Sequence, residues 1–134
     1  MKRFSFGKNS RLISNRQFET VLSQRLRRSD DLLILYTAQN DCGQPRLGIS
    51  VGKSCGNAIV RNRLKRLVRE AFRQSAEQIP AGFDYVIMFS PKWLKRAGES
   101  KLVKAAAMQL TSEQVKKSMI QLAAEAVKLV KNDL

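Results

Sequence analysis

Apolar residues recur along the chain with two spacings, one typical of helices and the other typical of strands. In SNRQFETVLSQ they recur at helical spacing, so we expect a helix over about 15–24. A capping box supports its start, because Ser14 can cap the first turn and Gln17 can return the hydrogen bond. Before it, residues 1–13 are polar and basic and are expected to form an extended arm.

Two strands and a turn are expected next. The stretch DLLILYTAQ is short and rich in strand-forming residues, which predicts a strand over about 32–39. After the turn cluster NDCGQP, the stretch RLGISVG alternates between two faces. One face is apolar and carries Leu47, Ile49 and Val51, and the other is small and polar and carries Arg46, Gly48 and Ser50. Either water or a flat partner must cover this second face.

The middle of the chain predicts one more helix and one more strand. A helix is expected over about 58–76, because its apolar residues form one stripe on a helical wheel. The stretch FDYVIMFS predicts a strand over about 83–90, and Pro91 ends it.

The last helix begins at a second capping box. Thr111 can cap it with Gln114 at the return position, and the helical pattern continues to about Val130. Residues 92–109 have helical composition, and an extra short helix is expected there. The order helix, strand, strand, helix, strand, helix predicts a single α+β domain over 1–134, a two-layer sandwich with helices packed on a small mixed sheet.

Composition adds a strong charge to this picture. The chain carries 25 Lys and Arg against 11 Asp and Glu, a formal charge of +14. A small domain this basic most often meets a polyanion, either nucleic acid or an anionic membrane. No apolar run approaches the roughly 20 residues that span a bilayer. Cys42 and Cys55 have no zinc spacing, so we expect free thiols, a reducing compartment and a cytoplasmic location.

Candidate catalytic chemistry is scarce. The chain has no histidine, which excludes Ser-His and Cys-His nucleophile pairs and the usual general base at neutral pH. The acids are scattered, without a paired-carboxylate pattern. A protein that hydrolyses nucleic acid unaided is therefore not expected.

The helix over 58–76 concentrates the charge. Its polar side, which we call the basic arc, carries Arg61, Asn62, Arg63, Lys65, Arg66, Arg69 and Arg73. Like charges four residues apart repel by a few tenths of a kcal/mol per pair, and Glu70 relieves only part of this. An external anion would supply the missing charge, and phosphates suit the forked arginine side chain. The alternative is a solvated helix face.

The motif RNRLKRLVREAFR resembles the signature of the bacterial ribonuclease P protein subunit. The resemblance extends through GISVGKSCGNAIV before it, RLISNRQFETVL, the two flanking strands and LTSEQVKKSMIQL, roughly over 6–90 and 110–125. It implies a protein whose partner RNA holds the catalytic groups and most of the Mg²⁺, with none bound tightly by the protein. It further implies one protein per catalytic RNA, contact with the 5′ leader of precursor tRNA, and a left-handed β-α-β crossover.

The resemblance implies two RNA-contacting surfaces. The surface facing the catalytic RNA comprises Lys53, Arg61, Asn62, Arg63, Lys65, Arg66 and Arg69. The leader-binding cleft comprises Phe18, Tyr36, Arg46 and Ser50. Aromatic side chains on a sheet can stack unpaired bases with little sequence preference. For Phe18 and Tyr36 the alternative is an ordinary core position.

The chain departs from the family pattern at several positions. Ser54 stands where a second lysine is common, Leu22 where an aromatic residue is common, and Ser90 where a basic residue often follows the strand. Residues 92–109 resemble an insertion. The main alternative function is a ribosomal protein or general RNA chaperone, whereas a single-stranded RNA module, a membrane-surface protein and a stand-alone nuclease are not expected.

Overall fold

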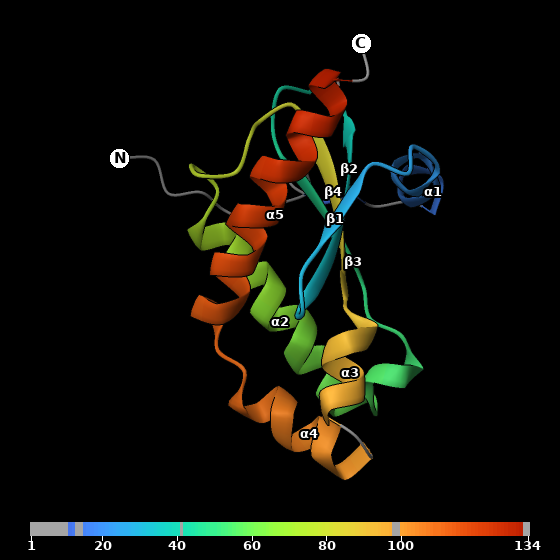
Figure 1. Ribbon diagram of the computed structural model, residues 1–134, viewed down its shortest axis with the longest axis vertical. Helices are drawn as coiled ribbons and strands as arrows, with labels where there is room; N and C mark the ends of the chain where they lie inside the picture. Colours follow the sequence, from blue (N-terminus) through green and yellow to red (C-terminus); the bar gives the residue numbers. More distant parts are fainter. Residues whose placement is uncertain (1–10, 13–14, 41, 98–99, 133–134) are drawn as a thin grey trace.

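The computed structural model describes residues 11–12, 15–40, 42–97 and 100–132. Within these ranges, two helices cover one face of a four-stranded sheet and a third helix lies against the other face (Figure 1). The predicted cap at Ser14 and most of the predicted N-terminal arm lie outside the described residues.

The sheet contains the three predicted strands and one more. Its order is β1 (Arg27–Ser29), β2 (Leu33–Gln39), β4 (Phe83–Phe89) and β3 (Arg46–Ser50). β2 pairs antiparallel with β1 and β4, whereas β3 pairs parallel with β4, so the sheet is mixed as predicted. The sequence pattern did not indicate β1, because all three of its residues are exposed and none is apolar.

The two long helices form the main core with the sheet. They are α2 (Ala58–Gln74) and α5 (Ser112–Asn132). The predicted apolar stripe of α2 is buried, including Val60, Leu64 and Val68. The α2 helix begins at Asn57, whose side-chain oxygen accepts a hydrogen bond from the Val60 N–H at 3.1 Å. Such a cap typically contributes about 1 kcal/mol.

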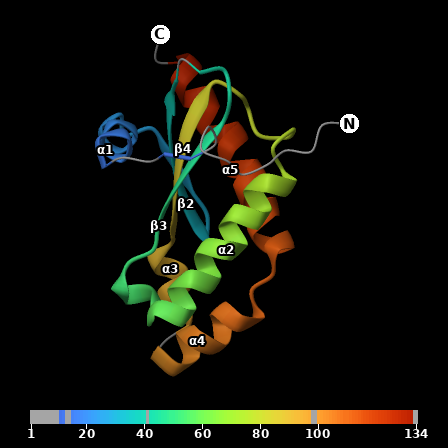
Figure 2. The same cartoon turned by 180° about the vertical axis from the view of Figure 1, so that it is seen from behind.

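The connection from β3 through α2 to β4 has the uncommon hand. In Figure 1 both strands run downward, α2 returns upward to their left, and β4 lies nearer the viewer than β3, which Figure 2 shows from behind. This path is left-handed, as the resemblance implied, although right-handed crossovers are the rule.

The opposite face of the sheet is covered in part by α1 (Asn15–Ser23), which forms a second, smaller core. Leu12, Val21, Ala38 and Val86 are buried in it, and Phe18 is half-buried against them. The predicted helix over 15–24 is confirmed to within one residue.

Residues 91–97 and 100–109 form two helices where one short helix was expected. They are α3 (Pro91–Ala97) and α4 (Ser100–Gln109). They pack on each other at one end of the molecule, and α4 also packs on α2 (Figure 1). Pro91 ends β4 as predicted and also begins α3, because the first helical position needs no N–H donor. The second capping box is present, since Thr111 N–H donates to Gln114 Oε1 at 2.9 Å.

None of the described helices combines the length and apolar character that crossing a membrane requires.

Candidate nucleic-acid interface

The basic arc lies along the outer side of α2. Asn62, Arg66 and Arg69 are exposed, whereas Arg61, Arg63 and Lys65 are half-buried. A shallow groove of about 480 Å³ follows the arc and is lined by Asn62, Arg66, Arg69, Glu70 and Arg73. The asparagine thus lies among guanidinium groups, in a groove that an anionic chain could follow.

The single acid of α2 is already engaged. Glu70 Oε1 accepts hydrogen bonds from Arg73 and Gln74, and the Arg73 bond holds the pKa of the Glu70 carboxyl below its usual value. Because Glu70 is committed to the end of the helix, it gives little relief to Arg66 and Arg69. The unrelieved charge predicted from the sequence is therefore present in the fold.

Arg63 has a structural role that the sequence did not indicate. Its guanidinium donates to the carbonyl oxygens of Ala107, Met108 and Leu110 at 2.9, 3.0 and 3.2 Å. These carbonyls end α4 and begin the link to α5, so Arg63 ties α2 to this junction. A contact between Arg63 and RNA stays a prediction.

Arg61 leaves one donor unpaired. Its Nε atom is shielded from solvent and has no hydrogen-bond partner among the described residues. A buried polar group without a partner costs about 1–3 kcal/mol. Its positive charge also acts on Cys55, where burial raises the thiol pKa and Arg61 lowers it in part.

Lys53 lies in the loop that leads into α2. It begins a short 3-10 turn, η2 (Lys53–Cys55), and its side chain is exposed. Gly56 follows with φ of 118°, a conformation that side chains rarely adopt, and the chain then reaches the cap at Asn57. The turn places Lys53 next to the N-terminal end of the helix that carries the basic arc.

The Phe18 ring covers the middle of the β3 face that carries Arg46, Gly48 and Ser50. A Cβ atom at Gly48 would lie 2.6 Å from Cζ of Phe18, so only glycine lets the ring approach this closely. Gly48 is buried as a result, whereas Ser50 at the end of the same face is exposed. The second face of β3 is therefore covered by an aromatic ring in its middle and open at its end.

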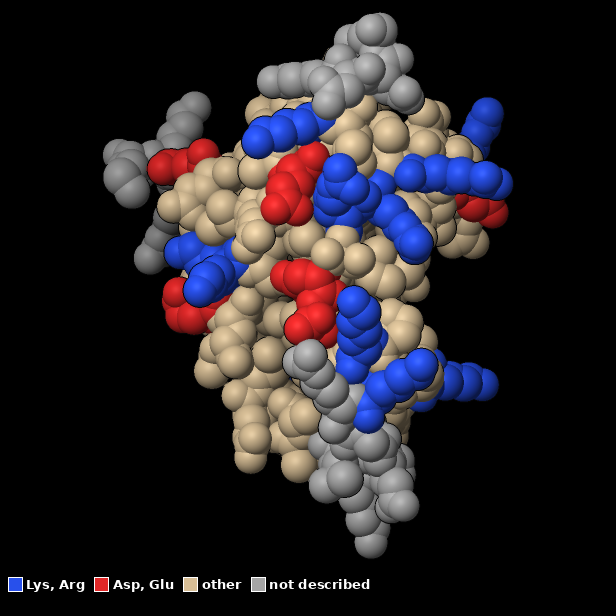
Figure 3. Space-filling view, in the orientation of Figure 1, with Lys and Arg blue, Asp and Glu red and all other residues tan. Residues whose placement is uncertain are grey.

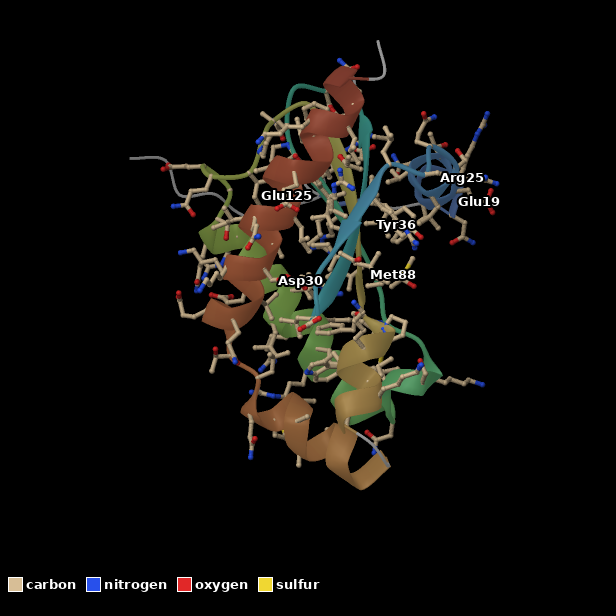
Figure 4. The ribbon with its side chains drawn as sticks, viewed as in Figure 1. Glu19, Arg25, Asp30, Tyr36, Met88 and Glu125 are labelled. Atoms are coloured by element: carbon tan, nitrogen blue, oxygen red, sulfur yellow. The ribbon has the colours of Figure 1, made fainter. Side chains whose placement is uncertain are left out.

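Tyr36 lies on the same sheet face as Phe18. Its neighbours across the sheet are Val86 and then Gly48, and its side chain is half-buried. Tyr36 and Met88 both project toward the side where α1 lies (Figure 4). The Arg27 guanidinium lies 5.9 Å from the Tyr36 ring centroid and donates to its hydroxyl at 3.3 Å.

Sequence reasoning did not identify Arg27 or Met88 as part of this face. Arg27 lies on β1, a strand without an apolar pattern, and Met88 reads as an ordinary strand residue. Only the strand register shows them, because it pairs Arg27 with Tyr36 and Ser50 with Met88.

Arg46 is engaged within the protein. It forms a two-pronged ion pair with Asp84, with distances of 2.6 and 2.7 Å, and Asn40 donates to the same carboxylate at 2.8 Å. Arg46 begins β3 and Ser50 ends it, so the two predicted cleft residues lie on either side of Gly48. The structure thus brings Phe18 and Tyr36 to one sheet face and spreads Arg46 and Ser50 along it.

A small hollow joins the two predicted surfaces. It measures about 140 Å³ at the β3 edge and is lined by Arg11, Leu12, Phe18, Leu47, Gly48, Ile49, Lys65 and Arg69. Phe18 comes from the predicted cleft, and Lys65 and Arg69 come from the basic arc. An aromatic face and a row of cations therefore meet at one edge of the sheet.

No group of three or more potential metal-binding side chains occurs within the described ranges. The expectation that an RNA holds the Mg²⁺ stays a prediction.

These features define a small basic α+β domain whose cationic helix adjoins a sheet face with half-buried aromatic side chains. The family model described as Ribonuclease P matches residues 6–111. The chain belongs to the ribonuclease P protein family.

Two relatives show the extent of the similarity. The ribonuclease P protein component of Brevibacillus brevis is 43% identical over 86 residues, which cover 63% of this chain and 68% of the relative. That of Bacillus cereus strain B4264 is 32% identical over 115 residues, or 84% of this chain and 87% of the relative. The family that the motif suggested is thereby confirmed.

Solved structures agree with the fold. The ribonuclease P protein from Thermotoga maritima superposes with a TM-score of 0.69 at 27% identity, covering 84% of this chain and 94% of that protein. The protein from Staphylococcus aureus gives a TM-score of 0.64 at 25% identity, covering 91% and 95%. The α+β class and the mixed sheet are thus shared with ribonuclease P proteins.

Proposed function

We propose that this protein is the protein subunit of a ribonuclease P ribonucleoprotein. In this role it binds a catalytic RNA through the basic arc and Lys53. It holds the 5′ leader of precursor tRNA on the sheet face beside Phe18 and Tyr36. The RNA cleaves the leader, and the protein increases the amount of precursor that is bound productively.

One observation carries this proposal beyond family membership. The hollow at the β3 edge is lined by Phe18 on one side and by Lys65 and Arg69 on the other. Stacking on an aromatic ring holds a base without regard to its identity, and adjacent cations bind the phosphates. A leader of variable sequence that leads toward a catalytic RNA needs both kinds of contact side by side.

The exposed guanidinium groups of Arg66 and Arg69 support the same role, because arginine can bind phosphate through two parallel hydrogen bonds. Mg²⁺ is expected to be held mainly by the RNA. We further expect one protein per RNA, no membrane partner and a cytoplasmic location.

The test is reconstitution. We expect the purified chain alone to leave precursor tRNA intact, because it has no histidine and no paired carboxylates. Added to a bacterial ribonuclease P RNA at low Mg²⁺, it should raise the rate at which the 5′ leader is removed. Cleavage by RNA-free protein, or no effect of the protein on the RNA reaction, would contradict the proposal.

A further inference from the structure

The helices α3 and α4, which together we call the α3–α4 segment, are attached to the rest of the protein at two places. At one end the Trp93 ring lies 5.3 Å from the Phe89 ring, measured between centroids. At the other end Ala107 is fully buried, and Arg63 donates to three carbonyl oxygens at the junction with α5. Because the segment is attached at both ends, its outer side has a defined position relative to the sheet and α2.

Apolar and basic positions separate on α3. Trp93 and Leu94 pack against the main core, whereas Lys92 and Lys95 are exposed. Lys92, Lys95 and Arg96 follow one another at i, i+3 and i+4, which places these positions on one side of a helix. The helix is therefore amphipathic, and its outer side is cationic.

The charged residues of the segment are almost all positive. Residues 91–109 contain five Lys or Arg and a single acid, Glu99. On α4, Lys101 and Lys104 repeat the three-residue spacing. Acids from outside the segment border it, because Asp30 and Asp31 line one hollow together with Lys92. Acidic side chains also lie among the basic ones on the part of the surface that carries α5 (Figure 3). Like charges at helical spacing repel one another, so an external polyanion would relieve the segment as it would the basic arc.

We propose that the α3–α4 segment is a second contact surface for RNA phosphates, and that Arg63 connects it to the helix that carries the basic arc. The inference rests on the proposed function and specifies a further surface for it. The exposed cations Lys92 and Lys95 make the phosphate contacts. Arg63 fixes the segment relative to α2, so both surfaces engage the same RNA.

The position of the segment selects the catalytic RNA over the leader. The segment packs on α2, whereas Phe18 and Tyr36 lie on the sheet face that α1 covers. In Figure 1 the segment lies at the lower end of the molecule, while α1 lies at the upper right. Arg63 joins the segment directly to the helix that carries the basic arc, so an RNA that lies along this arc also meets the segment.

The experiment measures binding of the full chain to a bacterial ribonuclease P RNA across a salt series. Lys95→Gln should lower the slope of log affinity against log salt by roughly 0.7–0.9, the effect of one phosphate contact. Adding Lys92→Gln should double that loss. Between about 50 and 200 mM salt, the unsubstituted chain should then lose roughly 7- to 12-fold more affinity than the double variant.

Two controls separate charge from folding. Lys128→Gln removes an exposed charge near the C-terminal end of α5 and should leave the slope unchanged. Replacing both Lys92 and Lys95 by Arg keeps the charge and should keep the slope. Thermal unfolding of every variant should match that of the unsubstituted chain, because Lys92 and Lys95 are exposed.

Three outcomes overturn the inference. If the unsubstituted chain binds the RNA and the double Gln variant has the same slope, the segment makes no phosphate contact and the proposed function stands. If the slope changes only when precursor tRNA is present, the assignment to the catalytic RNA is wrong. If the unsubstituted chain does not bind the RNA at all, the proposed function itself fails.

Discussion

At the scale of single residues, the fold gives Phe18 features of both interpretations that the sequence left open. The ring is half-buried: it packs on Gly48 and among the residues of the smaller core, and it also lines the hollow at the β3 edge. A residue in this position contributes both to folding and to the shape of a binding surface. Substitutions must therefore be compared with a neighbour that contributes only to folding.

Phe18→Ala should weaken binding to precursor tRNA roughly five- to hundred-fold, because a lost base stack costs about 1–3 kcal/mol. Mature tRNA has no leader and should be affected much less. Val21→Ala is the matched control, since Val21 is fully buried in the same helix and cluster. Val21→Ala should lower the melting temperature, and it should not change the ratio of the affinities for precursor and mature tRNA. Equal weakening for both tRNAs with Phe18→Ala would remove Phe18 from the leader site.

Arg66 offers the simplest test of the basic arc, because its side chain is exposed in the groove along α2. Arg66→Ala should reduce the log–log salt slope of binding to the RNA by about one and leave stability within about 0.5 kcal/mol. Lys128→Ala, on the exposed side of α5, should change neither quantity. An unaltered slope with Arg66→Ala would mean that the groove is only solvated.

At the scale of helices and strands, periodicity predicted every element with a buried apolar pattern. It located α1, α2, α5, β2, β3 and β4 to within a few residues. It did not find β1, which is stabilised by its pairing with β2 rather than by burial. It also could not show that Arg63 turns inward, because the partners of Arg63 are backbone carbonyls 44 to 47 residues away.

Arg63→Lys should loosen α4 while keeping the charge of the basic arc. Lysine cannot reproduce the forked set of donors, so some of the three carbonyl bonds are lost, at about 1–3 kcal/mol. Hydrogen exchange should accelerate in residues 105–110 and stay unchanged in β2. Arg66→Lys, at an exposed position of the same helix, is the control. Unchanged protection of α4 would show that the Arg63 bonds do not hold the segment.

At the scale of the whole molecule, the sheet order is what the sequence could least predict. β2 and β3 are consecutive predicted strands joined by a turn, a pattern that favours a hairpin, yet β4 lies between them. The resemblance to a family supplied the crossover that local patterns could not. The same arrangement places α2 over the β3 side of the sheet, so that Lys65 and Arg69 reach the hollow beside Phe18.

The central place of β4 has a consequence for synthesis of the protein. The nascent chain contains β2 and β3 well before it contains β4, their common partner. From Ser50 to Phe89 the ribosome needs roughly 2–8 s at about 5–20 residues per second. During this interval two apolar strands have unpaired edges, which favour aggregation. The polypeptide is thus most vulnerable midway through translation, and its strong positive charge, which keeps nascent copies apart, is an advantage at that stage.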